Sequence, residues 1–229
     1  HRFGAIVTFL YFGLHVVSVA GKAWRGRGTL RDPATGKFGI KRLWAAVFGP
    51  DSMIPTMQDW KDFVAHNKWF FGKGPRPQFD RWTYWEKFDF MAVFWGMFAI
   101  GGSGILLWKP EWSSWLVPGW VMNIAALVHS EEALLAALFI FTIHFFNTHF
   151  IPNKFPMDRL IFTGTYRLEE LKEQRPLEYQ RLMAEGRLES MKREHPGIPL
   201  KLISATFGLG SLLLGLMLTV LILWSLLFA

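Results

Sequence analysis

The sequence of 229 residues contains no cysteine. This absence excludes disulfide bonds, thiolate zinc sites, cysteine-held iron–sulfur clusters and the Cys-x-x-Cys-His attachment of a c-type haem. Any bound metal must therefore be held by histidine, carboxylate or methionine side chains.

Charge is nearly absent from four long apolar stretches, in a chain that is 51% hydrophobic. Residues 202–229 carry no charge, residues 3–20 and 88–108 carry at most one acid, and residues 130–151 carry two acids near the start. About 20 apolar residues in a helix cross the hydrocarbon core of a bilayer. The sequence therefore predicts an all-α integral membrane protein in which four transmembrane helices form a bundle.

Basic residues collect in two of the connections between these stretches. Of the 25 lysines and arginines, 13 lie in residues 21–87 and 10 in residues 152–201, whereas the connection 109–118 has only Lys109. Such a bias places 21–87 and 152–201 in the cytoplasm. The net charge of +7 thus reflects membrane topology, gives no support for nucleic-acid binding, and suits contact with anionic lipid headgroups.

The cytoplasmic segments also contain helical patterns. One helix is expected near residues 57–69, and residues 165–194 predict an amphipathic cytoplasmic helix, or a broken pair, with Pro176 near a start. We expect the whole of 1–229 to form one membrane domain. Because His1 stands at the edge of an apolar stretch with no signal-peptide pattern before it, we also expect a longer parent chain with an incomplete N-terminus here.

The seven histidines provide the candidate site. His1 and His15 are about 40° apart around an α-helix, and His129 and His144 about 60°, so each pair occupies one face of its helix. Members of each pair are separated by roughly 21–23 Å along the axis. In the predicted topology His1 lies level with His129, and His15 level with His144.

Two facing imidazoles at each of two depths are what two bis-histidine haems require. Without cysteine, both haems must be noncovalent b-type haems, with His1, His15, His129 and His144 as iron ligands. Ionisable residues inside a membrane are costly and usually functional.

Other polar residues near these histidines have weaker signals. His149 faces away from His129 on an ideal helix, so it is an interfacial side chain, a haem-propionate or quinone contact, or the true ligand if the helix kinks. Arg2 can pair with a haem propionate. The remaining histidines, His66 and His195, lie in polar segments and are expected to be solvated.

Short motifs across residues 1–165 resemble the membrane cytochrome b subunits of formate dehydrogenase and thiosulfate reductase, and their relatives encoded with multihaem cytochromes. The motifs include His-Arg-Phe-Gly-Ala at 1–5, Gly-Pro-Arg-Pro-Gln-Phe-Asp-Arg-Trp at 74–82, Tyr-Trp-Glu-Lys-Phe-Asp at 84–89, Gly-Gly-Ser-Gly at 101–104, His-Ser-Glu-Glu-Ala at 129–133, His-Phe-Phe-Asn-Thr-His-Phe at 144–150, Lys-Phe-Pro-Met-Asp at 154–158 and Phe-Thr-Gly at 162–164.

The resemblance implies a dihaem cytochrome b of the bacterial inner membrane that exchanges electrons between a quinone pool and an outer-face redox partner. By position, His1 and His129 would hold the outer haem and His144 the inner one. In the dehydrogenase branch an additional upstream helix supplies the fourth ligand, and here His15 is the available substitute. The partner would be a multihaem cytochrome c or an iron–sulfur protein, and the quinone would bind beside the inner haem.

The predicted function is therefore transmembrane electron transfer as a subunit of an oxidoreductase complex that oxidises quinol or reduces quinone. Two alternatives remain open. One is a cofactor-free membrane anchor or assembly subunit, in which the histidines only pack. The other is a metal or proton transporter that uses His129, Glu131 and Glu132, although transporters favour broken helices at the midplane.

Overall fold

The computed structural model describes residues 1–33, 35–194 and 197–228. Within these residues the chain is helical, with one isolated β-bridge between Arg31 and Phe38 and no β-strand. Four helical stretches are long and apolar enough to cross a membrane: Arg2–Leu30, Tyr84–Trp108, Gly119–His149 and Ile198–Phe228. The prediction of an all-α, multi-pass membrane protein with four spans is thus confirmed at this level.

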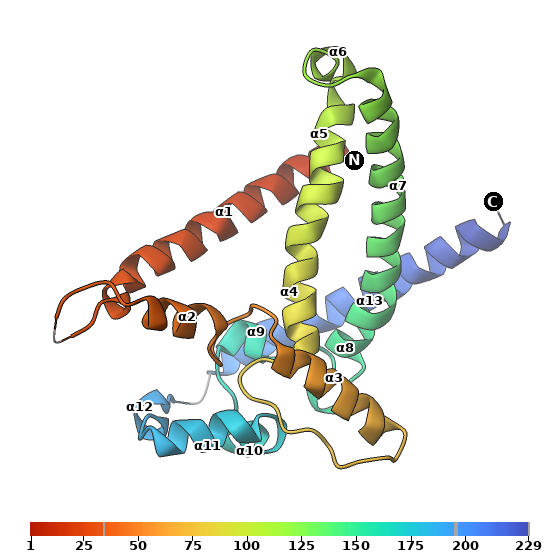
Figure 1. The fold of residues 1–229 in the computed structure, drawn as a ribbon. Helices are drawn as coiled ribbons and strands as arrows, with labels where there is room; N and C mark the ends of the chain where they lie inside the picture. The colour runs from red at the N-terminus through yellow and green to blue at the C-terminus, as the bar shows by residue number, and fades with distance from the viewer. Residues whose placement is uncertain (34, 195–196, 229) are drawn as a thin grey trace. The chain divides into compact units, whose positions relative to one another are not determined.

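Each predicted span appears as a helix or as consecutive helical segments (Figure 1). The segments are α1 (Arg2–Gly26) with the short η1 (Arg27–Leu30), then α4 (Tyr84–Gly96), η2 (Met97–Gly101) and α5 (Gly102–Trp108), then α7 (Gly119–Phe139), η3 (Ile140–His144) and α8 (Phe145–His149), and finally α13 (Ile198–Phe228). Their apolar side chains are widely exposed. A helix that lies in hydrocarbon needs apolar side chains on its outer surface, and its backbone hydrogen bonds must be made within the helix.

The second and third spans each contain one π-helical turn, η2 and η3. The sequence did not predict these turns. A π turn adds about one residue to a helical turn, so the residues after it are rotated by roughly 100° from their positions on an ideal helix. The facing angles calculated from the sequence for His144 and His149 therefore do not hold after η3.

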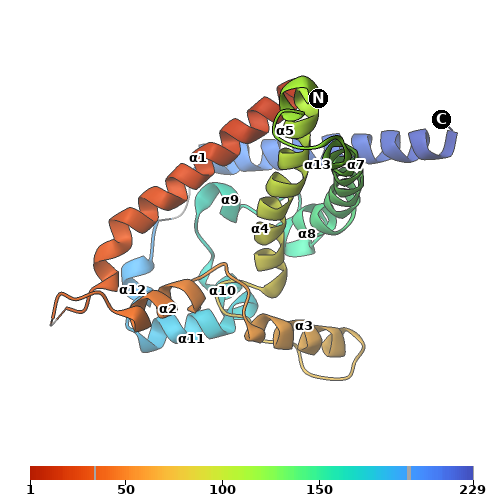
Figure 2. The ribbon, with the colours of Figure 1, turned by 45° about the horizontal axis from the view of Figure 1, so that its top comes forward.

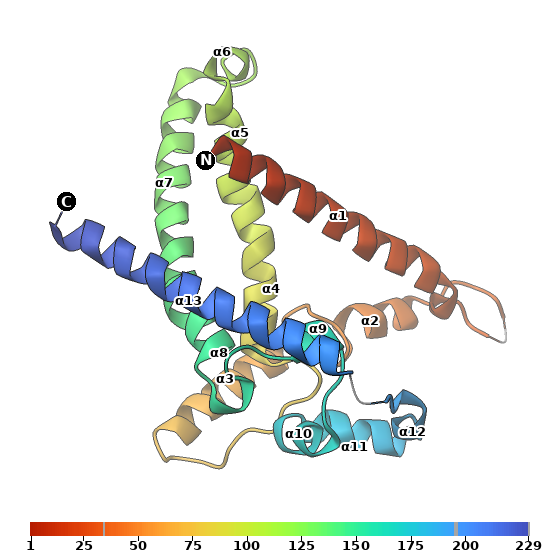
Figure 3. The same ribbon diagram turned by 180° about the vertical axis from the view of Figure 1, so that it is seen from behind.

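The chain divides into two compact units, His1–His129 and Ser130–Ala229. In the first unit, α4 and α5 run antiparallel to the start of α7, and the short α6 (Pro110–Ser113) lies in their connection (Figure 3). The N-terminal end of α1 lies beside α5 in all three views (Figures 1, 2 and 3). There Phe9 packs on Gly101, where an added Cβ would lie 3.1 Å from the Phe9 ring.

Outside its spans, the first unit contains α2 (Ile40–Phe48) and α3 (Met57–Phe70). α3 is the helix predicted near 57–69, and it begins in a capping box in which Asp59 accepts hydrogen bonds from the backbone and hydroxyl of Thr56. The same carboxylate forms an ion pair with Lys87 of α4, with Nζ and Oδ1 2.9 Å apart. This buried pair fixes α3 beside the first turn of the second span.

The second unit joins α8 to the last span through short helices: η4 (Pro152–Lys154), α9 (Leu160–Thr163), α10 (Leu168–Gln174), α11 (Pro176–Ala184) and α12 (Leu188–Met191). The predicted amphipathic segment is thus a broken series, and Pro176 is the first residue of α11 as expected. α13 packs on α8 and α9 (Figure 3) through one buried face made of Ser204, Gly208, Leu212 and Gly215. An added Cβ at Gly208 would lie 2.8 Å from Cβ of Met157, so this contact requires glycine.

Candidate functional site

The first unit brings together His1, at the start of α1, and His129 of α7. Their ring centroids are 5.7 Å apart and the ring planes make an angle of 87°. His1 is exposed and His129 is half-buried. The sequence placed these two residues at one level, and in the structure they are neighbours.

His129 is held by its Nδ1 atom. Nδ1 lies 3.0 Å from the carbonyl oxygen of Ile100 and 3.2 Å from Oγ of Ser103. Because a carbonyl oxygen only accepts hydrogen bonds, Nδ1 must carry the proton. The imidazole is thus fixed in the tautomer whose Nε2 has a lone pair available for a metal.

The two acceptors of the His129 proton lie within the π turn and just after it, at Ile100 of η2 and Ser103 of α5. Ile100 lies within η2, where the backbone hydrogen-bond pattern departs from the α-helical one and a carbonyl can accept from outside the helix. The buried Ser103 hydroxyl donates to the carbonyl of Ala99 at 2.5 Å. Its oxygen is then oriented to accept the Nδ1 proton of His129.

Gly104 allows the close approach of α5 to His129. An added Cβ at this position would lie 3.0 Å from Cε1 and 3.4 Å from Nδ1 of the His129 ring. By contrast, an added Cβ at Gly102 would meet nothing within 4 Å. Among these neighbouring glycines, Gly104 is therefore the one that makes room for the imidazole.

Arg2 follows His1 directly in the chain. Its guanidinium carbon is 5.6 Å from the centroid of the Trp108 ring, and Nη2 donates to the Trp108 carbonyl at 3.5 Å. This cation therefore stays at the end of α5, close to the start of α1.

His15 has aromatic surroundings in the first unit. It is half-buried, and its ring lies 6.0 Å from Phe90 and 6.2 Å from Phe94, both edge-on. The other predicted ligand of the inner haem, His144, ends η3 in the second unit and is exposed. The pairing of His15 with His144 stays a prediction.

His149 is buried in the second unit, with 4% of its surface exposed. Its Nδ1 donates to the carbonyl oxygen of Pro156 at 2.6 Å, and its ring centroid lies 4.7 Å from that of Phe145. An interfacial side chain that reaches out to the headgroups would be exposed, so that interpretation of His149 is wrong. Like His129, it is held in the tautomer that leaves Nε2 as the acceptor.

The expectation that His66 is solvated is also wrong. The half-buried ring lies between aromatic side chains, stacked on Trp69 at 5.4 Å and 5.3 Å from Trp85, and Nδ1 is 3.0 Å from the Tyr84 hydroxyl. Burial lowers the pKa of the His66 imidazole below its ordinary value of 6.5, and the charge of Arg76 lowers it further. His195 lies outside the described residues.

Sequence reasoning missed the residues that hold His129. Gly104 appeared only within the motif at 101–104, and nothing in the sequence gave a role to Ser103 or to the Ile100 carbonyl. No family model, no curated protein and no solved structure matches this chain.

Proposed function

We propose that this chain is a b-type cytochrome, the membrane subunit through which an oxidoreductase complex transfers electrons. In this proposal His1 and His129 ligate one haem near the outer face. The observation that supports it most directly is the pairing of the two imidazoles, one from α1 and one from α7, in a unit that also fixes the His129 tautomer.

The spacing of the rings is compatible with a shared iron. Imidazoles that share one metal ion, through metal–nitrogen bonds of about 2 Å, have ring centroids no more than about 6 Å apart. The centroids of His1 and His129 are 5.7 Å apart.

The surroundings of His129 suit a metal ligand as well. Histidine ligands commonly donate their other ring N–H to a carbonyl or carboxylate, which fixes the ring and makes the ligating nitrogen more basic. His129 has this arrangement through Ile100 and Ser103.

In this proposal the protein positions the haem and shields it from water. The haem supplies reversible one-electron chemistry when it is bound. His1 and His129 would hold it, Gly104 leaves room for the His129 ring, and Arg2 places a cation near the outer end of the site, where a propionate would be neutralised. The widely exposed apolar residues of these helices keep the surroundings dry once they lie in lipid.

A second b haem, ligated by His15 and His144, completes the proposed electron path across the membrane. His149 is a further candidate there, because its Nδ1 donates to the Pro156 carbonyl and its Nε2 can accept a hydrogen bond from a hydroxyl of a quinol. The sequence resemblance supports the rest of the proposal: the bacterial inner membrane, a quinone pool, and an outer-face partner that is a multihaem cytochrome c or an iron–sulfur protein.

The experiment that tests this function is a haem count. The reduced-minus-oxidised visible spectrum and the pyridine haemochrome of the purified chain should give two b haems per chain. His129→Leu should remove one and leave the other, while His66→Phe, which removes an imidazole outside the spans and keeps an aromatic ring, should retain both. A haem-free wild-type chain after haem-replete expression, or two haems in His129→Leu, would overturn the proposal in favour of an anchor or transporter.

A further inference from the structure

A cationic surface lies outside the site described above, at the end of α3 and in the loop that follows it. Two open cavities, each of about 430 Å³, occupy this surface, and both are lined by Lys68 and Lys73. Neither ammonium group forms an ion pair with an acidic residue in the described part of the chain, and no acidic residue lines either cavity. The surface is therefore strongly positive.

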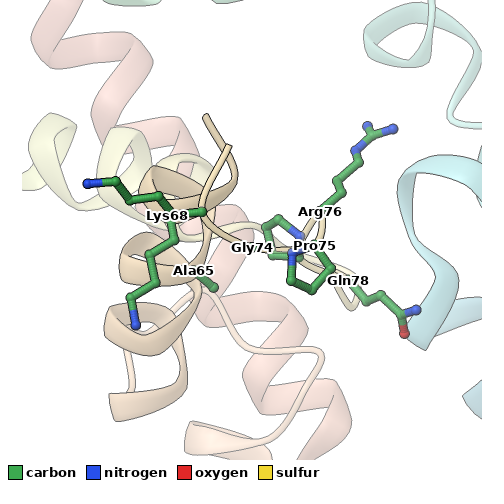
Figure 4. Close-up of a pocket in the computed structure, with 8 residues that line it drawn as sticks. Ala65, Lys68, Gly74, Pro75, Arg76 and Gln78 are labelled. Atoms are coloured by element: carbon green, nitrogen blue, oxygen red, sulfur yellow. The ribbon is translucent and has the colours of Figure 1, made fainter. Parts of the chain in front are cut away.

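The two cavities differ in their walls. The first is lined by the loop 73–78, which adds Arg76 and two prolines (Figure 4). The second has an apolar wall made of Phe63, Val64 and Phe71. A basic rim beside an apolar wall matches a molecule with an anionic head and a hydrocarbon tail.

The basic side chains do not close around one point. Figure 4 shows Lys68 and Arg76 extending outward on different sides of Gly74 and Pro75. A small free anion is best held by donors that converge on it, whereas charges that fan out suit a layer of headgroups.

The depth of the cationic surface in the membrane follows from the position of α3 relative to the second span. The ion pair between Asp59 and Lys87, at 2.9 Å, joins α3 to the first turn of α4. The Phe63 ring also lies 5.5 Å from that of Tyr84, the first residue of the span. Since α4 enters the hydrocarbon at this end, α3 lies at the level of the headgroups.

Large aromatic side chains at the end of α3 are exposed. Phe70 and Phe71 have 77% and 68% of their surface accessible. Aromatic rings beside lysines are typical of helices that lie in the membrane interface.

We propose that the C-terminal half of α3 and the loop 71–78 form a binding site for anionic phospholipid. Lys68 and Lys73 contact the headgroup phosphates, the apolar wall of Phe63, Val64 and Phe71 takes the start of an acyl chain, and Phe70 enters the apolar edge of the leaflet. The site is separate from the histidines and does not depend on the proposed electron transfer.

Native mass spectrometry of the full chain tests this site, with dioleoylphosphatidylglycerol and dioleoylphosphatidylcholine as probes. The wild type should retain the anionic lipid in preference. Because each basic residue near a surface contributes about 1 kcal/mol, the double variant Lys68→Gln/Lys73→Gln should bind it about 30-fold more weakly. Lys61→Gln, also exposed on α3 but outside both cavities, is the matched control and should bind as the wild type does.

Three results would overturn the proposal. The first is equal retention of both lipids by the wild type. The second is unchanged binding of the anionic lipid by the double variant, which would leave the surface to an acidic protein segment. The third is displacement of the lipid by millimolar inorganic phosphate, which would make the ligand a soluble anion. Far-ultraviolet circular dichroism of each variant shows that a loss of binding is not a loss of fold.

Discussion

His129 donates its Nδ1 proton to the carbonyl oxygen of Ile100 at 3.0 Å, across 29 positions of the chain. The acceptor belongs to a π turn of the second span and the donor to the third. This bond decides which nitrogen of the imidazole can act as a ligand.

Replacing Ser103 by alanine should weaken haem binding without abolishing it. The substitution removes one of the two acceptors of the His129 Nδ1 proton and leaves Ile100. Loss of an outer hydrogen bond commonly lowers metal affinity 10- to 100-fold, and we expect about the lower figure here. Transfer of haem to excess apomyoglobin measures this change. A transfer rate equal to that of the wild type would show that the serine does not support the ligand.

Gly104→Val should displace the His129 ring and lower the occupancy of one haem. An added Cβ lies 3.0 Å from Cε1 of that ring, and the branched side chain of valine adds to the clash. Gly102→Val on the same helix is the matched control, since its Cβ meets nothing within 4 Å. Haem per chain from the pyridine haemochrome compares the two. Equal occupancy would mean that the ring is not a ligand in this position.

Breaking the Asp59–Lys87 pair should destabilise the junction of α3 and α4. Both side chains are about nine-tenths buried, and removal of one partner leaves an unpaired buried charge, which costs about 3–5 kcal/mol. We expect Lys87→Met to lower the thermal unfolding midpoint in detergent and to increase hydrogen exchange in α3. Lys192→Met removes an exposed pair with Glu189 and should change stability by less than about 1 kcal/mol. Similar effects of the two variants would contradict the importance of the buried pair.

The junction should also lose stability in mild acid. Burial and Arg76 lower the pKa of His66 in the folded protein below 6.5, so the unfolded chain binds more protons in this range. The contribution of His66 to the free energy of unfolding is complete above pH 6.5 and is lost as the pH drops through the lowered pKa. Burial raises the pKa of Asp62 above 3.8 in the folded protein, so this carboxyl group destabilises the fold when it is ionised. Its effect on stability is opposite to that of His66, because protonation of Asp62 at lower pH stabilises the folded state.

Unfolding midpoints between pH 7.5 and 5 measure this dependence, with His66→Phe as the comparison. The variant keeps the aromatic contacts and cannot be protonated, so its curve should be flatter. Parallel curves for the two proteins would assign the acid sensitivity to another group.

How far the sequence could predict the site is clearest at His129. Helical periodicity and the direction of the chain were enough to place His1 level with His129, and the rings are indeed neighbours. The π turns, the acceptors of Nδ1 and the aromatic surroundings of His66 did not follow from periodicity. The hydrogen bonds of His129 and His66 join residues 18 or more positions apart, such as His66 and Tyr84.

By itself, the sequence determined the four membrane spans and the helix near 57–69, because the length and hydropathy of a helical stretch depend on residues that are neighbours in the chain. Only the tertiary structure decided which nitrogen of His129 is available, why Gly104 must lack a side chain, and where α3 is held. Those properties arise where separate helices meet, and a hydrogen bond or an ion pair there depends on distances that local sequence does not specify.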